Sequence, residues 1–407
     1  MSPPVDARSA AEGGRAIDVV RRTRARAKIN LTLEVLGRRA DGYHALRSVV
    51  AFADVADTLT FAPSPDADTL SLRVTGPFAA ALHATAETDN LVVQAADAVR
   101  CASAFDCAEV PPGRDGGAGA ANITASGPIP NAPGPSEPAA SRPVLCGSVI
   151  LDKRLPVAGG IGGGSADAAA MLRLLRDVFE DDADHRQRQA RRGLGADAAS
   201  TPVNAHEKAG SRGNGPAGDA ARDALDWMAI ARALGADVPV CLLNASALMT
   251  GIGERLQPLD HLPAFAAVLV NPGVTLETAP VFKALNAPAL PAAAADREDA
   301  SEALKVRADN AALAHLPTSD DRDAWFAYLK RSPNDLAAPA TALAPEIAHA
   351  LTLLEAAPGC RLARMSGSGP TCFGLFDDEN AARAAARALQ LEAPSWWVHA
   401  TRLGAPA

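Results

Sequence analysis

The chain has 407 residues, of which 48% are hydrophobic, and its formal net charge is −8. This length and composition indicate a globular protein of about two domains, and the acidic balance argues against a nucleic-acid-binding protein. The six cysteines form no C-x-x-C pair, which favours reduced thiols in a cytoplasmic protein, with a metal site at Cys101 and Cys107 as the alternative. No apolar run reaches the roughly 18–20 residues that span a bilayer, so no membrane partner is expected.

Residues 1–24 are expected to form a mobile N-terminal extension, because about the first 22 are mostly polar. The first strand is then predicted in Thr23–Val35, where apolar residues alternate as in a half-buried strand. That alternation places Lys28 and Asn30 together on the other face.

A turn-rich segment, Gly37–Gly42, separates this strand from the next apolar segment, and Tyr43 and His44 follow the turn directly. From the residues alone, Tyr43 is interpreted as a core residue and His44 as a satisfied loop histidine. Further strands are predicted at Leu46–Val55, Asp57–Phe61 and Leu70–Val74, and a helix at Asn90–Val99 with Asn90 near its cap.

Three stretches are predicted to be insertions rather than parts of the core. Residues 102–143 are rich in Gly, Pro, Ala and Ser, residues 180–222 are charged and poor in aromatics, and residues 286–321 are polar and Ala-rich. Such segments bury too little apolar surface to offset the entropy of ordering, although the third contains good helix formers.

A glycine loop follows a predicted strand at Ser148–Leu151, and five glycines fall within the six positions of Gly159–Gly164. The apolar spacing after this loop predicts a helix, so the loop offers backbone N–H groups and a helix start to an anion such as phosphate. Ser165 is placed either to cap that helix or to offer its hydroxyl to a phosphate or its metal ion. The alternative is a flexible linker. The Walker pattern does not fit, because Gly164 stands where that motif has lysine.

Asp237 is carried by a glycine turn into the apolar run of Leu234–Leu242. The pattern favours a helix cap for this acid, and the alternative is a functional group at a low-dielectric edge.

The last third of the chain contains several recognisable elements. A small-residue turn leads into an alternating strand in Arg364–Phe376, and this pattern alone favours a hairpin turn over a binding loop. Before it, we expect a hairpin turn at Thr250–Glu254, a buried strand at Ala266–Val270 and a helical region at Asn334–Glu355.

Three segments together resemble the ordered motifs of the GHMP kinase superfamily, which includes galactokinase, homoserine kinase, mevalonate kinase and phosphomevalonate kinase. They are Ala27–Asn30, Leu155–Ala168 and Met365–Gly369, and their order and spacing match once the insertions are set aside. Within this superfamily the chain is most similar to the 4-diphosphocytidyl-2-C-methyl-D-erythritol kinase family of the non-mevalonate isoprenoid pathway. That closer resemblance is carried by Arg39–His44 with Leu46, Asp89–Leu91, Gly235–Pro239 and Asn271–Val274.

The resemblance implies ATP-dependent phosphorylation of the 2-hydroxyl of 4-(cytidine 5'-diphospho)-2-C-methyl-D-erythritol, with ATP and Mg²⁺ as cofactors and this small molecule as the partner. It implies that Lys28 and Asp237 pair beside the acceptor hydroxyl as the catalytic residues. The residues that it places at the nucleotide are Asn90, Lys153, Pro156, Ala158, Gly159, Gly160, Gly162, Gly163, Gly164, Ser165, Ala166, Ser366, Gly367, Ser368 and Gly369.

On the substrate side, the resemblance implies that Tyr43 and Phe282 sandwich the cytosine and that His44 reads its polar edge. The other substrate candidates are Asn30, Thr275 and Thr278. For two nucleotide candidates a purely structural reading stays open, with Lys153 as a solvated lysine and Asn90 as a helix cap.

The implied fold is α+β with two domains, residues 25–248 for ATP binding and catalysis and residues 249–402 for substrate, and with the active site in the cleft between them. Three alternatives remain: another GHMP-type kinase acting on mevalonate, homoserine or a sugar; a decarboxylase or non-catalytic ligand sensor on this fold; and a scaffold that uses the insertions. Retention of both Lys28 and Asp237 speaks against a sensor.

Overall fold

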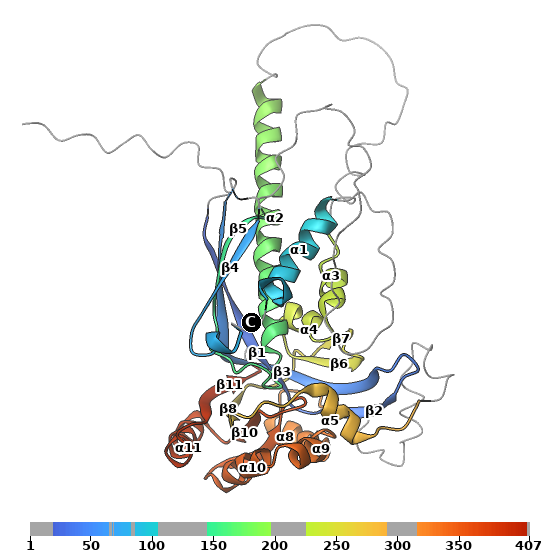
Figure 1. The fold of residues 1–407 in the computed structure, drawn as a ribbon, viewed down its shortest axis with the longest axis vertical. Helices are drawn as coiled ribbons and strands as arrows, with labels where there is room; N and C mark the ends of the chain where they lie inside the picture. The colour runs from blue at the N-terminus through green and yellow to red at the C-terminus, as the bar shows by residue number, and fades with distance from the viewer. Residues whose placement is uncertain are drawn as a thin grey trace, which may run out of the picture.

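The computed structural model describes residues 19–64, 67, 69–82, 86–104, 145–196, 225–290 and 316–404, and only the backbone of residues 184–196. Outside this described part lie residues 1–18 of the expected extension and Cys107. Most of the first and third expected insertions, and the second insertion from residue 197 onward, also lie outside it. The described elements form two parts, one stacked on the other in Figure 1.

The N-terminal part packs helices against one side of a twisted sheet (Figure 1). Its strands are β1 (Arg21–Asn30), β2 (Glu34–Arg38), β3 (His44–Pro63), β4 (Leu70–Thr75), β5 (Gly147–Asp152), β6 (Ala247–Gly251) and β7 (Arg255–Pro258). Its helices are α1 (Leu91–Ala104), α2 (Gly163–Ala196), α3 (Trp227–Leu234) and α4 (Val238–Leu243), with short 3-10 turns η2 (Ala79–Leu82) and η3 (Glu87–Asp89).

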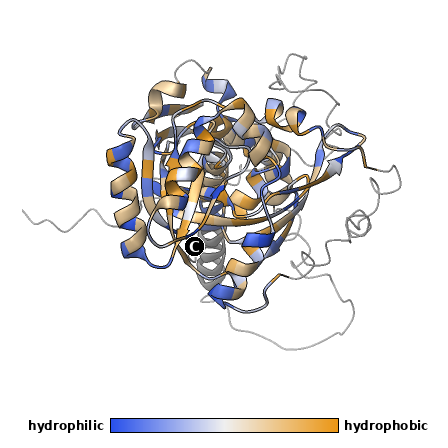
Figure 2. Ribbon diagram, turned by 90° about the horizontal axis from the view of Figure 1, so that it is seen from below, coloured by the Kyte–Doolittle hydropathy of each residue, from blue (hydrophilic) through white to orange (hydrophobic). Residues whose placement is uncertain are grey.

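The C-terminal part contains strands β8 (Phe265–Asn271), β9 (Cys360–Met365), β10 (Cys372–Phe376) and β11 (Trp397–Leu403). Its described helices are α5 (Thr278–Leu285), α8 (Arg322–Arg331), α9 (Ala337–Leu343), α10 (Glu346–Ala356) and α11 (Glu379–Glu392). Figure 2 shows the molecule from below, coloured by hydropathy. Every residue of β8 and β10 is buried. In α11 the buried residues Ala382, Ala385 and Leu389 have the spacing of one helix face.

Strand β3 holds the two parts together. It pairs with β1, β2, β5 and β6 in the N-terminal part, and at Ala53 it meets Leu403 of β11, so the described strands run as one sheet in the order β4-β5-β3-β11-β8-β10-β9 with the others off this path. Val50 and Phe52 pack into the core with α1 and α2, while Val49 and Ala51 pack into the core of β8, β10 and α8. The middle of β3 is buried on both faces over Ser48–Ala53, and its residues from Val49 to Ala53 are accordingly all apolar.

Several predicted elements are confirmed: the buried strand appears as β8, the hairpin turn lies between β6 and β7, and the helix after Asn90 is α1. The helical region from Asn334 is divided into α9 and α10. The small-residue turn joins β9 to β10, whose residues are all buried rather than alternating. Cys101, Cys146, Cys241, Cys360 and Cys372 are free thiols.

Other predictions need correction. Residues 21–24 belong to β1 and pair with β3, and the predicted single strand Thr23–Val35 is broken between β1 and β2. Residues 25–30 are all buried, so the strand is not half-buried. The second expected insertion is helical in its first part, because α2 continues to Ala196 through a stretch rich in helix formers.

The expected domain boundary between Leu248 and Met249 falls inside β6, which pairs with β3. In the part of the chain that is described, no helix has both the length and the apolar character needed to cross a membrane.

Candidate active site

The glycine loop is a folded turn that joins β5 to α2. Ala158, Gly160 and Gly162 have φ values of 54°, 70° and 64°, a left-handed conformation that glycine adopts without strain. Helix α2 starts at Gly163, and its first backbone bond runs from Ala166 N–H to the Gly162 carbonyl at 2.8 Å. Ser165 therefore lies in the first turn of α2, which corrects the expectation that it caps the helix. The first N–H groups of α2 remain as donors for an anion.

The turn between β9 and β10 presses against this loop from the C-terminal part. Thr371 N donates to Gly159 O at 3.1 Å, and the Ser366 hydroxyl donates to Gly160 O at 3.2 Å. A Cβ on Gly160 would lie 2.5 Å from Gly369 O, so only glycine fits there. Two segments more than 200 residues apart thus form one continuous wall, and Ser366–Gly369 packs on the glycine loop as well as making a hairpin turn.

Lys28 and Asp237 meet directly beside the glycine loop. Lys28 Nζ lies 2.8 Å from Asp237 Oδ2, the Lys28 N–H donates to Ile161 O at 3.0 Å, and a Cβ on Gly162 would lie 3.2 Å from Lys28 Cε. Asp237 occupies the N-cap position of α4, but its side chain makes no capping bond. The cap interpretation is therefore wrong for its carboxylate, which pairs with the lysine instead.

Exposure differs sharply within this ion pair. The Lys28 side chain is 5% exposed and the Asp237 side chain 36%. The carboxylate can therefore meet a hydroxyl group that enters from solvent, while the buried ammonium stabilises negative charge in a low-dielectric setting.

Asn30 lies two residues beyond Lys28 and is 1% exposed. Its amide nitrogen donates to Ser48 Oγ at 2.7 Å and its backbone N–H to Ser366 Oγ at 3.0 Å. Its Oδ1 is buried without a hydrogen-bond partner and would lie 3.4 Å from a Cβ on Gly367. A buried acceptor of this kind is expected to be satisfied by a bound group.

His44 and Phe282 form the aromatic part of the site. Their rings stack with centroids 4.7 Å apart and an interplanar angle of 29°. Tyr43 is 59% exposed, which corrects its interpretation from the residues alone as a core residue. Burial, and secondarily the charge of Arg38, lowers the pKa of His44 below its usual value, which favours a neutral ring near pH 7.

The two threonine candidates differ in position. Thr278 begins α5 and its hydroxyl hydrogen-bonds the Ser368 hydroxyl at 2.8 Å, which joins α5 to the Ser366–Gly369 turn. Thr275 is exposed.

Lys153 and Asn90 make structural contacts. Asn90 Oδ1 accepts from Val92 N at 2.9 Å at the start of α1, which is the capping role. Lys153 is 2% exposed, so it is not a solvated lysine. Its Nζ donates to Asp57 Oδ2 at 2.6 Å and to Asp167 Oδ2 at 2.5 Å. Burial alone would lower the Lys153 pKa, but the two carboxylates raise it overall.

Asp167 is a buried acid of this group whose pKa is shifted. Burial raises its pKa from 3.8 to about 7, against the opposing effect of Lys153. The Asp167 carboxyl therefore keeps its proton up to a higher pH in the folded protein than in the unfolded chain. This difference stabilises the folded state at low pH, and the stabilisation is lost as the pH rises through about 7. We expect the free energy of unfolding of the wild type, relative to Asp167→Asn, to fall between pH 5 and pH 8. Urea unfolding of both proteins across this range measures the difference, and a difference that stays constant would contradict the prediction.

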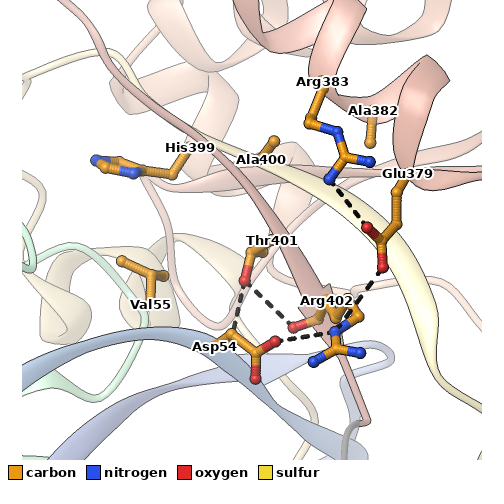
Figure 3. Close-up of a pocket in the computed structure, with 9 residues that line it drawn as sticks. All are labelled: Asp54, Val55, Glu379, Ala382, Arg383, His399, Ala400, Thr401 and Arg402. Atoms are coloured by element: carbon orange, nitrogen blue, oxygen red, sulfur yellow. Dashed lines mark hydrogen bonds and ion pairs between the residues drawn. The ribbon is translucent and has the colours of Figure 1, made fainter.

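A hollow of about 640 Å³ lies between β3, β11 and α11. The residues that line it, drawn in Figure 3, include none of the expected site residues. Its charges pair with one another: Arg402 lies 3.1 Å from Asp54 and 4.0 Å from Glu379, and Arg383 lies 2.9 Å from Glu379. It therefore offers little unpaired positive charge to a triphosphate.

Sequence reasoning missed several residues that shape the site. Asn334 donates to Met365 O and Gly367 O, both at 2.8 Å, and so fixes the closing turn. Asp57 holds Lys153 and the start of the glycine loop. The sequence held a signal for Asp57, because an acid that follows a run of apolar strand residues is rarely buried unless it is paired.

Comparisons with known proteins find two family models that match this chain. The family models "GHMP kinases N terminal domain" and "GHMP kinases C terminal" match residues 138–203 and 318–394. A 4-diphosphocytidyl-2-C-methyl-D-erythritol kinase of Methylorubrum extorquens is 41% identical over 94% of this chain and 98% of its own length. One from Rhodopseudomonas palustris is 40% identical over 93% and 96%.

Solved structures share the fold. A crystal structure of 4-(cytidine 5'-diphospho)-2C-methyl-D-erythritol kinase covers 95% of this chain and 100% of its own, with 28% identity and a TM-score of 0.55. A homoserine kinase from Cytophaga hutchinsonii, at 15% identity, covers 97% of this chain and 96% of its own with a TM-score of 0.53 and shows the shared fold. From the full-length similarity to the bacterial relatives, the chain belongs to the 4-diphosphocytidyl-2-C-methyl-D-erythritol kinase family of GHMP kinases.

Proposed function

We propose that this protein transfers the γ-phosphoryl group of ATP to the 2-hydroxyl of 4-(cytidine 5'-diphospho)-2-C-methyl-D-erythritol, a step of the non-mevalonate isoprenoid pathway, in the cytoplasm. We infer phosphoryl transfer from the Lys28–Asp237 ion pair at 2.8 Å, which lies beside a glycine loop at the start of a helix. The substrate follows from the names of relatives about 40% identical to nearly the whole chain.

The chain's own groups account for the chemistry. The acceptor hydroxyl gives its proton to the Asp237 carboxylate as its oxygen bonds to the γ-phosphorus. The bond from that phosphorus to the β,γ-bridging oxygen breaks, and ADP leaves. Lys28 holds the carboxylate in place and stabilises the negative charge of the transferring group, while the loop N–H groups hold the triphosphate.

The glycine loop suits a triphosphate. Gly164 is exposed in the first turn of α2, so its backbone is open to an oxyanion. No group of three or more His, Cys, Asp or Glu among the described residues is placed to hold a metal ion. Mg²⁺ would therefore be held mainly by the oxygens of ATP itself, and it would neutralise their charge.

The base would bind at the aromatic part of the site. We place the cytosine between the exposed ring of Tyr43 and the stacked His44–Phe282 pair, where His44 would read the polar edge of the base. Stacking of a base on an aromatic side chain contributes on the order of 1–3 kcal/mol. Asn30, Thr275 and Thr278 are proposed to contact the rest of the substrate.

Gly164 offers a direct test of the triphosphate site. A Cβ there would meet Leu91 Cδ1 at 3.5 Å, an ordinary contact, and alanine favours a helix over glycine by about 1 kcal/mol. Gly164→Ala should therefore fold at least as stably as wild type but raise the KM for ATP about tenfold, because the methyl group obstructs the phosphate. Steady-state kinetics and thermal unfolding check both parts, and an unchanged KM would contradict the placement.

The substrate assignment is tested by coupled ADP release with the cytidyl substrate, mevalonate, homoserine and galactose. We expect turnover only with the cytidyl substrate. If mevalonate, homoserine or galactose is turned over preferentially, the proposed substrate is wrong and the protein is another GHMP-type kinase.

A further inference from the structure

Asp57 is a fully buried acid of β3 that takes no part in the chemistry described above. It is 0% exposed, and β3 places it where β5 ends and the chain turns toward the glycine loop, since Thr58 pairs with Asp152. A buried carboxylate is costly unless hydrogen bonds and a counter-charge compensate it. The hydrogen bonds of the Asp57 carboxylate therefore show which parts of the chain it positions.

One carboxylate oxygen of Asp57 fixes the entry to the glycine loop. Oδ1 accepts the backbone N–H groups of Arg154 and of Leu155, the latter at 2.8 Å. These are the last residues before Pro156, where the loop starts. Hydrogen bonds from two consecutive N–H groups to one charged oxygen orient that peptide segment closely.

The other oxygen reaches the exit of the loop through Lys153. Oδ2 accepts from Lys153 Nζ at 2.6 Å, and the same ammonium donates to Asp167 Oδ2, in the second turn of α2, at 2.5 Å. The ammonium also lies against the helix start, 3.2 Å from where a Cβ on Gly163 would be. One buried side chain thus ties both ends of the loop to β3.

We propose that Asp57 is a positioning residue for ATP: it sets the entry of the glycine loop and, through Lys153, the start of α2 at the separation that the triphosphate requires. The inference rests on the proposed placement of the triphosphate on this loop. Misplacement of bound groups by about 1 Å is enough to cost large factors in phosphoryl transfer.

The test compares Asp57→Asn and Asp57→Ala with wild type. Asparagine can still accept the two backbone N–H groups but cannot accept from Lys153 through its amide nitrogen, whereas alanine loses every contact. We expect the KM for ATP to rise severalfold in Asp57→Asn and about tenfold or more in Asp57→Ala. The KM for the cytidyl substrate should stay within twofold, because His44 lies at the other end of β3, 13 residues before Asp57, and Phe282 belongs to α5.

Asp54→Asn is the matched control. Asp54 lies three residues earlier in the same strand and is also ion-paired, to Arg26 at 3.3 Å and Arg402 at 3.1 Å, but at the hollow of Figure 3 rather than at the loop. We expect this variant to lose some stability with both KM values within twofold of wild type. A purely structural role for Asp57 would give the same pattern as this control, and that result would overturn the proposal.

The Gly164→Ala variant separates the two possible failures. If it raises the KM for ATP while Asp57→Asn and Asp57→Ala do not, the triphosphate site stands and the role of Asp57 is refuted. If none of the three variants changes the KM for ATP, the triphosphate does not bind on this loop, and the proposal fails with that placement. All measurements are made on the full chain, well below the unfolding temperature of the least stable variant.

Discussion

Replacement of Asp237 by asparagine is expected to lower kcat by about 10²- to 10⁴-fold, the usual contribution of a positioned proton acceptor. Asparagine keeps the shape of the side chain but cannot accept the proton of the acceptor hydroxyl as that oxygen attacks phosphorus. Because the change acts on the transition state, the KM values for both substrates should change little. Initial rates at saturating ATP and cytidyl substrate measure the loss.

Asp226→Asn is the matched control for this result. Asp226 is exposed and caps α3, where its side chain accepts from Ala229 N at 2.8 Å, so kcat should stay within twofold of wild type. Near-normal turnover in Asp237→Asn would remove this acid from the chemistry. Thermal unfolding checks that the loss of the ion pair to buried Lys28 has not unfolded the variant.

Lys153→Met is expected to destabilise the fold by about 3–5 kcal/mol, the range for removing one partner of a buried ion pair. The substitution leaves Asp57 and Asp167, which are both buried, without their shared cation. Urea unfolding at pH 8, where the Asp167 carboxyl of the wild type is mostly ionised, measures the change.

A second variant isolates the cause of that loss. Adding Asp167→Asn to Lys153→Met removes one of the two stranded acids and should restore part of the stability. If Lys153→Met unfolds within 1 kcal/mol of wild type, the triad of Asp57, Lys153 and Asp167 does not hold the loop in the way proposed.

Local sequence patterns predicted those elements that a local pattern determines. The apolar run of β8, the hairpin turn between β6 and β7 and the helix after Asn90 agree with the structure. The break between β1 and β2 could not be predicted, because a distant segment causes it. Leu33 N donates to Pro333 O at 3.2 Å, and Asp335 N donates to Leu33 O at 2.8 Å.

The site shows the same difference between features that the local sequence determines and features that depend on distant segments. The glycine loop and the charge of Lys28 were readable from the residues, and the family resemblance implied the Lys28–Asp237 pair, which the structure confirms at 2.8 Å. Spacing favoured Asp237 as a helix cap, yet its carboxylate faces a lysine more than 200 residues earlier. The sequence around Lys153 did not indicate its two carboxylate partners. They come from β3 and α2, which are brought together only in the folded protein.

Proton-coupled ³¹P NMR of a reaction with ATP and the cytidyl substrate tests the central claim most directly. The 2-carbon of the methylerythritol carries no hydrogen, so phosphate on its hydroxyl has no three-bond coupling to a proton. We predict one new phosphomonoester singlet that grows with ADP and is strongly reduced with Asp237→Asn. A doublet or triplet would place the phosphate on another hydroxyl, and the absence of any new signal while the cytidyl substrate stays intact would contradict the kinase activity.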